Sequence, residues 1–193
     1  MRPILTIVDD FLPNPDLVRR EVLAQGFEDV PFEGTIYHTV NVKYQPAEIP
    51  AGLGRLFNRP INILVSAFRE GRKGSHLHNL VHSDTTCASL ASVLYLNPAT
   101  PLRSGTAFWR HRATGWTQQP TDDQLQKAGL TIEEFCKDWH NPDAWDQTNF
   151  AEAQYNRLIT YPTSLFHSRW PWGGFGDSSE SARLIHCAFF NLV

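Results

Sequence analysis

Two histidines and an aspartate are spaced in this chain so that they could bind one metal ion. His82 and Asp84 are separated only by Ser83, and His167 follows far downstream. In an extended segment alternate side chains point to the same face, so His82 and Asp84 would point the same way. Two imidazoles and one carboxylate suit a divalent transition metal, and three ligands on one face of an octahedral ion leave three positions open for other reactants. The sequence therefore predicts a metal centre made by His82, Asp84 and His167.

Two other histidines compete for this assignment. His76 and His78 form a second pair that would share one face, shortly before His82. We favour His82 because it alone carries a carboxylate two residues later, and a hard ion with open positions prefers one anionic oxygen ligand beside the imidazoles. On this assignment His78 lies at the surface or behind the metal ligands.

Segments with the pattern of β-strands surround these residues in a definite order. The run 89–97 is apolar and precedes Pro98, and the run 104–109 starts with a glycine turn. The run 158–161 leads towards His167, and the run 183–190 is the last of the series. Apolar runs bounded by glycine and proline are typical of strands, so the triad is expected to lie within a mainly β domain.

Arg183 begins the last of these strands. It shares a strand face with Ile185, Cys187 and Phe189, which are all apolar. A charge on an inward apolar face is costly unless an anion meets it, so a bound ligand or an internal carboxylate must be its partner. A guanidinium suits a carboxylate, because it binds one through two parallel hydrogen bonds. The alternative is that this face is the outer one and Arg183 is solvated. His186 points the opposite way, which predicts an outer-layer or interface position for it.

From about Ile61 to the C-terminus the chain resembles the iron(II)/2-oxoglutarate-dependent dioxygenases, most closely their prolyl-hydroxylase-like branch. The resemblance implies a mainly β fold with flanking helices, built on a double-stranded β-helix, which is a jelly-roll or cupin-like barrel. The features that carry it are His82 and Asp84, the strand with Tyr95, the Ser104-Gly105-Thr106 turn, His167 and Arg183.

The resemblance also implies an activity and two cofactors. Fe(II) would be held by His82, Asp84 and His167, and 2-oxoglutarate would chelate the ion while its far carboxylate pairs with Arg183. Tyr95 matches a position at which related enzymes offer a phenol to the same carboxylate, although a core tyrosine is an equal alternative. The implied reaction is hydroxylation of an unidentified small-molecule or peptide substrate with release of succinate and carbon dioxide.

The chain departs from the family pattern in two ways. The interval between His167 and Arg183 is longer than usual, and its excess, 169–179, looks like an insertion beside the mouth of the site. No serine or threonine lies two residues after Arg183, where some branches have a second donor to the carboxylate, so Tyr95 is the candidate for that role. Three aromatic residues expected near the mouth favour a substrate with a flat or apolar face: Trp109, Trp170 and Trp172.

Length and composition indicate one domain, because 193 residues with 41% hydrophobic residues can build a single substantial core. Within the domain, residues 1–193, we expect an α/β support at 1–60, the barrel core at 61–115 and 156–193, and a helical insertion at 116–150. The support is expected to contain a strand at 3–8, a helix that begins at Asn14-Pro15 and ends at Gly26, and a short helix near 51–58.

Capping boxes predict two short helices in the insertion. Thr121 and Thr131 are each followed at the third position by Gln or Glu. On the rim of the barrel these helices, with Trp139 and Trp145, would form a lid that excludes water from a substrate. Packing on the outside of the barrel is an equal alternative.

Charge and hydropathy argue against several classes of function. The net charge is −3 without a basic run, so binding to nucleic acid is not indicated, and Arg69, Arg72 and Lys73 are expected in a solvated loop. No secretory or membrane-spanning segment is evident, which predicts a cytoplasmic protein. The three cysteines have no metal spacing and are expected to be reduced thiols. The oligomeric state stays open.

Two functions outside the oxygenase class also remain. A cupin-like protein with a structural or different catalytic metal would share the barrel but would have no use for Arg183. A non-catalytic interaction module would contact a protein partner through the aromatic hairpin at 170–175. The intact set of three ligands argues against the second alternative.

Overall fold

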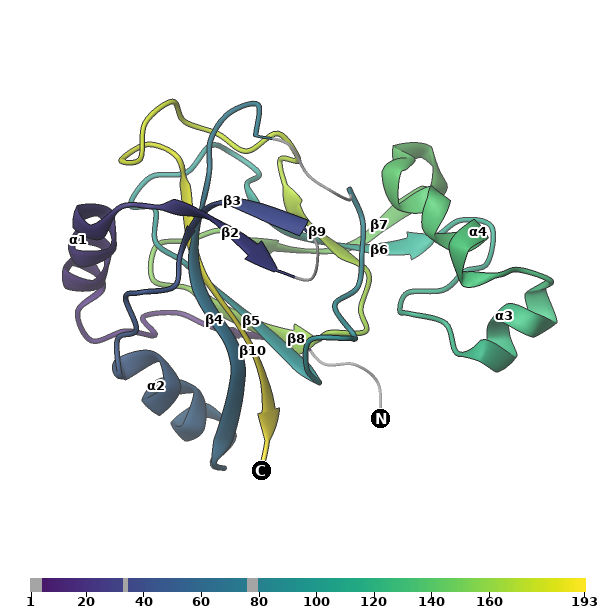
Figure 1. Cartoon of the computed structure of the whole chain (residues 1–193), viewed down its shortest axis with the longest axis horizontal. Helices are drawn as coiled ribbons and strands as arrows, with labels where there is room; N and C mark the ends of the chain where they lie inside the picture. Colours follow the sequence, from purple (N-terminus) through teal and green to yellow (C-terminus); the bar gives the residue numbers. More distant parts are fainter. Residues whose placement is uncertain (1–4, 33–34, 76–79) are drawn as a thin grey trace.

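The computed structural model of this chain describes residues 5–32, 35–75 and 80–193 (Figure 1). Its larger sheet contains β1 (Thr6–Val8), β2 (Glu28–Phe32), β3 (Thr35–Asn41), β4 (Ile61–Gly71), β5 (Leu90–Tyr95), β8 (Leu158–Pro162) and β10 (Arg183–Leu192). Its smaller sheet contains β6 (Gly105–His111), β7 (Trp145–Glu152) and β9 (His167–Trp170). The strand orders are β1-β8-β5-β10-β4-β3-β2 and β7-β6-β9, and neighbouring strands are antiparallel.

Helices cover the two sheets from opposite sides. Helices α1 (Pro15–Gln25) and α2 (Glu48–Phe57) lie beside the large sheet, whereas α3 (Asp122–Ala128) and α4 (Ile132–Cys136) lie beyond the small one (Figure 1). Two short 3₁₀ turns, η1 (Lys137–His140) and η2 (Pro142–Ala144), connect α4 to β7. The described part of the chain is therefore mainly β with four α-helices.

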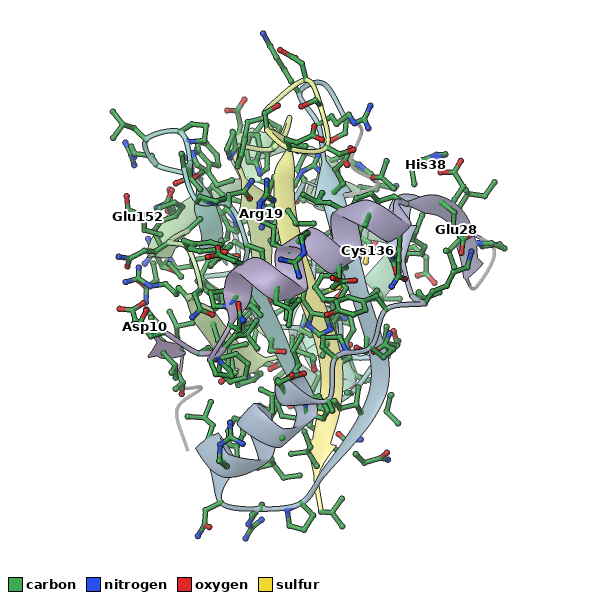
Figure 2. All side chains as sticks on the ribbon, turned by 90° about the vertical axis from the view of Figure 1, so that its left-hand side faces the viewer. Asp10, Arg19, Glu28, His38, Cys136 and Glu152 are labelled. Atoms are coloured by element: carbon green, nitrogen blue, oxygen red, sulfur yellow. The ribbon has the colours of Figure 1, made fainter. Side chains whose placement is uncertain are left out.

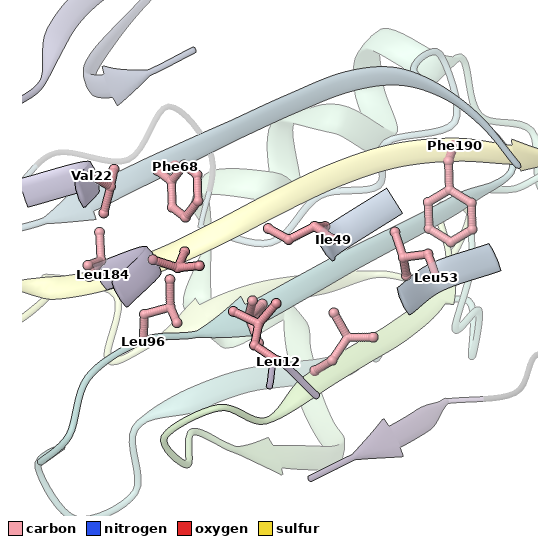
Figure 3. Packing of buried hydrophobic residues seen from close by; sticks show 11 residues of the cluster. Leu12, Val22, Ile49, Leu53, Phe68, Leu96, Leu184 and Phe190 are labelled. Carbon is pink, nitrogen blue, oxygen red and sulfur yellow. The ribbon is translucent and has the colours of Figure 1, made fainter. Parts of the chain in front are cut away.

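Strand β10 sits in the middle of the large sheet and separates two cores. Its even-numbered residues Leu184 and Phe190 belong to the core under α1 and α2, which Figure 3 shows from close by. Its odd-numbered residues Ile185 and Cys187 face the small sheet and pack in a second core with Phe108 of β6. Figure 2 shows α1 lying across the strands of the large sheet. The alternation of β10 thus sorts its side chains between the helices and the space between the sheets.

The outer face of the small sheet has a core of its own. The helical insertion supplies Phe135, which is 1% exposed, and β7 supplies Trp145, which is 2% exposed. Both rings pack against Phe166, just before β9. The insertion therefore lies on the outside of the small sheet, which is the alternative to a lid that the sequence left open.

Local sequence signals predicted several helix ends correctly. The Asn14 side chain accepts a hydrogen bond from the Leu17 backbone N–H at the start of α1, and the helix ends at Gly26. Thr121 and Thr131 form the capping boxes of α3 and α4. A side-chain oxygen at the N-cap satisfies a backbone N–H that has no partner within the helix, which is why these signals act locally.

Other expectations need correction. The helical part of the insertion ends before Trp145, since 145–152 forms β7 and pairs with β6 along its length. Arg69 lies in β4, not in a solvated loop, and only Arg72 and Lys73 are exposed as expected. Within the described ranges, no helix combines the length and apolar character needed to cross a membrane.

Candidate metal centre

The small sheet positions two of the three candidate ligands through the backbone. His167 is the first residue of β9, and a β-bridge joins it to His82. The His82 N–H donates to the His167 carbonyl at 3.1 Å, and the His167 N–H donates to the His82 carbonyl at 2.9 Å. The Asp84 N–H donates to the Thr163 carbonyl at 2.8 Å. These bonds fix the short segment 82–84 next to β9, so that residues far apart in the sequence meet.

The side chains of these residues converge on one point. His167 Nε2 lies 3.1 Å from Asp84 Oδ2, and His82 Nε2 lies 3.8 Å from Asp84 Oδ1. One ligand atom from each of the three residues lies within 4.8 Å of the others. The side chains of His82 and Asp84 are 29% and 19% exposed, so the cluster is open to solvent on one side. The structure thus brings together the set that the sequence proposed, in a geometry that one ion could bridge.

The protonation of the cluster also suits a metal. Burial opposes ionisation of Asp84, but the electrostatic interaction with His82 and the hydrogen bond from His167 outweigh it and hold the pKa of Asp84 at about 2. Burial lowers the pKa of His82 to about 4, which keeps its imidazole neutral. Burial also disfavours charge on His167, but the hydrogen bond to Asp84 raises the pKa of His167 above its usual value. A divalent ion would take the place of that shared proton.

The two histidines differ in what holds their rings. His167 Nδ1 lies 2.9 Å from the Leu165 carbonyl, so its N–H donates there, and Nε2 is directed at Asp84, where it would offer a lone pair to a metal once its shared proton is lost. His82 Nδ1 is buried and has no hydrogen-bond partner among the described residues. The donor set of two imidazoles and one carboxylate therefore fits a transition metal, with the orientation of His167 fixed by the backbone.

Arg183 lies on the inner face of the large sheet, between the two sheets. It is 7% exposed, and its strand partner on β4 is Gly71. Among the described residues no carboxylate pairs with it, and its Nε is buried without a hydrogen bond. Burial lowers the pKa of Arg183. The outward alternative for Arg183 is therefore wrong, and the side chain needs an anion that the described part of the chain does not supply.

Tyr95 lies beside Arg183. The guanidinium carbon of Arg183 is 5.9 Å from the centre of the Tyr95 ring. The Tyr95 hydroxyl reaches across to β6 and is 2.7 Å from Thr106 Oγ1. Thr106 is thus a hydroxyl that sequence reasoning missed, because it comes from the facing sheet and not from the strand of Arg183.

The other residues that the sequence singled out either lie away from the triad or fall outside the residues that the structure describes. His76 and His78 fall outside the described residues. His186 is 1% exposed and faces the core under α1 and α2, where its ring packs against Phe68. The tryptophans expected at the mouth pack in or against the core on the outer face of the small sheet: Trp109 within it, and Trp170 and Trp172 half-buried against it. They do not line the side of β9 on which the His167 side chain lies, so the expectation of an aromatic mouth made by them is wrong.

The insertion supports the segment that carries His82 and Asp84. The carbonyl of Trp139, in η1, accepts hydrogen bonds from the backbone N–H groups of Leu80 and Val81 at 3.0 and 3.1 Å. These residues lead directly into His82. The insertion therefore helps to hold the chain that carries two of the three ligands.

Two arginines near the triad were not found from the sequence. Arg69 stands on the inner face of β4, where its strand partner is Ile185 of β10. Arg169 stands two residues after His167 on β9 and donates to the carbonyls of Trp172 and Ser75. The signal for Arg169 was its even spacing from His167, which places both side chains on one face of a strand.

Comparisons with known proteins support the fold and assign a family. AviO1 from Streptomyces viridochromogenes Tue57 superimposes with a TM-score of 0.57 at 11% identity, over 98% of this chain and 90% of AviO1. SnoK, a non-heme alpha ketoglutarate dependent carbocyclase from nogalamycin biosynthesis, gives 0.54 at 14% identity, over 96% of this chain and 78% of SnoK. HygX from Streptomyces hygroscopicus, solved with iron bound, gives 0.47 at 10% identity, over 98% and 82%. The first two likenesses show a shared fold.

Sequence comparison is narrower. No curated protein matches the chain. A model of a family of unknown function, DUF6445, matches residues 72–170, and this segment contains His82, Asp84 and His167. Because the match spans more than half of the chain, the chain belongs to the DUF6445 family.

Proposed function

We propose that this protein is an iron(II)- and 2-oxoglutarate-dependent dioxygenase that hydroxylates a small-molecule or peptide substrate. One observation carries the proposal: the His82, Asp84 and His167 cluster lies between the sheets with the buried guanidinium of Arg183, for which the described residues supply no carboxylate partner. Three metal ligands explain the cluster, and an anionic cosubstrate explains the arginine. Bound iron(II) and 2-oxoglutarate would supply the oxidising chemistry, with succinate and carbon dioxide as coproducts.

Each residue has a definite task in this proposal. Asp84 provides the anionic oxygen ligand, and its low pKa keeps it ionised at neutral pH. His82 and His167 provide neutral nitrogen ligands. Arg183 holds the far carboxylate of 2-oxoglutarate by charge-assisted hydrogen bonds, and the Tyr95 hydroxyl adds a donor at the same end. Burial of Arg183 excludes water from this contact, which strengthens it.

The fold supports the same reading at a coarser level. SnoK shares the fold and depends on alpha ketoglutarate, although its low identity to this chain carries no residue role across. We propose further that the two facing sheets form the double-stranded β-helix of the 2-oxoglutarate oxygenases, with residues 1–193 as one domain. On this view α1 and α2 form the outer support, and α3 and α4 are an insertion between β6 and β7.

The inward direction of Arg183 favours this function over the alternatives. A cupin-like metal protein would have no use for a buried cation beside its metal. A non-catalytic interaction module would have no reason to keep three converging ligands, and its expected contact residues Trp170 and Trp172 are half-buried against the core on the outer face of the small sheet.

The test is an anaerobic titration of ferrous iron and then 2-oxoglutarate into the apoprotein. We expect a weak visible charge-transfer band when 2-oxoglutarate chelates the iron. Asp84→Ala should abolish the band, because it removes the anionic ligand. Arg183→Gln should keep the metal but raise the 2-oxoglutarate concentration needed by at least about tenfold, since a buried charge-assisted pair is lost.

Arg110→Gln is the matched control. Arg110 is an exposed arginine on β6 that pairs with Asp146 at 3.1 Å, away from the metal cluster, so its loss should leave the titration unchanged. Absence of the band in iron-loaded wild type would reject the dioxygenase. A band that Arg183→Gln leaves unchanged would reject the cosubstrate role of Arg183.

A further inference from the structure

Three arginines gather on the inner faces of the two sheets beside the metal cluster. Arg69 and Arg183 come from neighbouring strands β4 and β10, whereas Arg169 comes from β9 of the small sheet. Directly paired residues of antiparallel strands share a face, and the register pairs Arg69 with Ile185 and Arg183 with Gly71. Ile185 belongs to the core between the sheets, so Arg69 and Arg183 both point towards the small sheet.

The described residues supply no counter-ion for this cluster. The ion pairs of the other arginines lie elsewhere, as in Arg112 with Asp146 and Arg157 with Asp9. Burial and the charges of the other two arginines lower the pKa of Arg169 to about 10. Asp84 is the nearby carboxylate, and it is a candidate metal ligand. A divalent ion would add to the positive charge, and the two carboxylates of 2-oxoglutarate would neutralise only part of it.

The three guanidinium groups differ in how they are already occupied. Arg169 is tied to the backbone, because its Nε donates to the Trp172 carbonyl at 2.7 Å and its Nη2 to the Ser75 carbonyl at 2.5 Å. Its Nη1 lies over Gly71, where a Cβ would come within 3.1 Å of it. Arg183 is assigned to 2-oxoglutarate in the proposed function.

Arg69 has free donors and a fixed orientation. Its guanidinium carbon stands 5.3 Å from the centre of the Tyr37 ring on β3, an arrangement that holds the plane of the group. No hydrogen bond or ion pair joins the Arg69 side chain to any residue in the described ranges. The side chain is only half-buried, so a molecule from solvent can reach it.

We propose that Arg69 binds an anionic group of the primary substrate, a carboxylate or a phosphate, and so places the rest of that substrate at the metal. The proposal rests on the proposed function, because Arg183 must be engaged by 2-oxoglutarate for Arg69 to be the free cation. The substrate class is therefore acidic small molecules, or peptides with an acidic residue or terminus. A planar guanidinium fixes both position and direction of an oxyanion, which a hydroxylation at one carbon requires.

The test uses three probes of nearly equal size on protein saturated with zinc(II) and 2-oxoglutarate. Benzoate carries a carboxylate, phenyl phosphate carries a phosphate, and benzamide is the neutral match of benzoate. Calorimetric titration should show that at least one anion binds about tenfold or more tightly than benzamide. Arg69→Gln should remove that preference, and Arg69→Lys should restore it in part because the charge returns without the planar fork. Which of the two anions binds more tightly separates a carboxylate site from a phosphate site.

Two controls keep the outcomes separate. Arg110→Gln should change none of the affinities, because its guanidinium pairs with Asp146 on the surface. The charge-transfer band of the iron-loaded Arg69→Gln variant should need the same 2-oxoglutarate concentration as wild type, which also shows that the variant is folded at its site.

Three results would overturn the proposal. Equal binding of benzamide and both anions, or no binding of any of them, would remove the anion site. A loss of 2-oxoglutarate binding in Arg69→Gln would make Arg69 part of the cosubstrate site. Absence of the band in wild type would reject the proposed function and this inference with it, whereas a normal band without anion preference rejects this inference alone.

Discussion

Two buried polar residues on opposite faces of strand β10 have different roles. On β10 Arg183 faces the space between the sheets, and His186 faces the core under α1 and α2. Both are buried polar groups, yet only Arg183 lies near the candidate metal ligands. His186 has a hydrogen bond between its Nε2 and Ser66 Oγ at 2.9 Å, and its Nδ1 has no partner among the described residues. Its role is structural, and it makes the fold sensitive to acid.

The pH dependence of stability should report this residue. Burial lowers the pKa of His186 to about 3, so the unfolded chain binds a proton below about pH 6.5 that the folded chain does not. Stability is therefore lost as the pH falls from about 6.5 towards 3. We expect wild type to lose about 2 kcal/mol more than His186→Gln between about pH 7.5 and pH 5, measured by urea unfolding.

Glutamine is the informative replacement because it keeps a hydrogen-bonding group for Ser66 but has no titrating proton. The other histidines titrate equally in both proteins, so their contribution cancels in the difference. Parallel stability profiles for the two proteins would show that His186 binds its proton equally in the folded and unfolded states, so that folding does not lower its pKa.

At the scale of elements, the loop between β9 and β10 closes the end of β4. The Gly74 N–H donates to the Gly173 carbonyl at 2.8 Å, and the Lys73 N–H donates to the Gly176 carbonyl at 2.9 Å. The same loop provides the Trp172 carbonyl that accepts from Arg169. The segment between His167 and Arg183 thus packs against the end of the large sheet and helps to orient Arg169 beside the candidate metal ligands.

Gly174 is the residue that this packing requires. Its φ is +67°, and a Cβ there would lie 2.4 Å from the Arg72 carbonyl oxygen. Gly174→Ala should lower the free energy of unfolding by about 2 kcal/mol or more, since it combines left-handed strain with a backbone clash. Gly173→Ala is the matched neighbour, because a Cβ there meets nothing within 4 Å. Its effect should stay within about 0.5 kcal/mol, and equal losses in the two variants would contradict this packing.

The features that the sequence predicted depend on local interactions, whereas those that it missed depend on how the strands pair. The helix ends at Asn14, Thr121 and Thr131 were predicted because capping is a local interaction. The common direction of the His82 and Asp84 side chains was predicted because the alternation of side chains along an extended segment is also a local property. Arg69 was placed in a loop because its face depends on the register of β4 with β10, which the charged run around it does not reveal.

Strand β7 was missed for a related reason. Its central residues are polar and exposed, so the segment lacks the apolar run of a buried strand. Pairing with β6 makes it a strand, and that pairing is a tertiary contact. Local patterns therefore predicted the candidate metal ligands, whereas the arginines contributed by strand register were found only in the structure.

At the scale of the whole molecule, the proposed cofactors join parts that the chain holds separately. The three candidate metal ligands lie on the small sheet (His167) and on the segment beside it (His82 and Asp84). Arg183 belongs to the large sheet. An ion on the three ligands would tie together the small-sheet side alone. 2-Oxoglutarate on that ion would then reach Arg183 and link the two sheets. Stabilisation by the two ligands should therefore come in two separable steps.

Unfolding measurements can resolve these steps without any turnover. Zinc(II) at 100 times its dissociation constant should raise the free energy of unfolding by about 2.7 kcal/mol, and 2-oxoglutarate at the same ratio should add about as much again. Asp84→Asn should lose both increments, because no chelate forms without the ion. Arg183→Gln should keep the first and lose about half of the second or more at the same ligand concentrations, since an affinity for 2-oxoglutarate that is lower by about tenfold or more leaves about 1.4 kcal/mol or less. Removal of the metal with a chelator should return wild type to its apo stability. If 2-oxoglutarate stabilises the Arg183→Gln protein as much as wild type, the cosubstrate does not bridge the sheets through this arginine, and the buried guanidinium has some other partner.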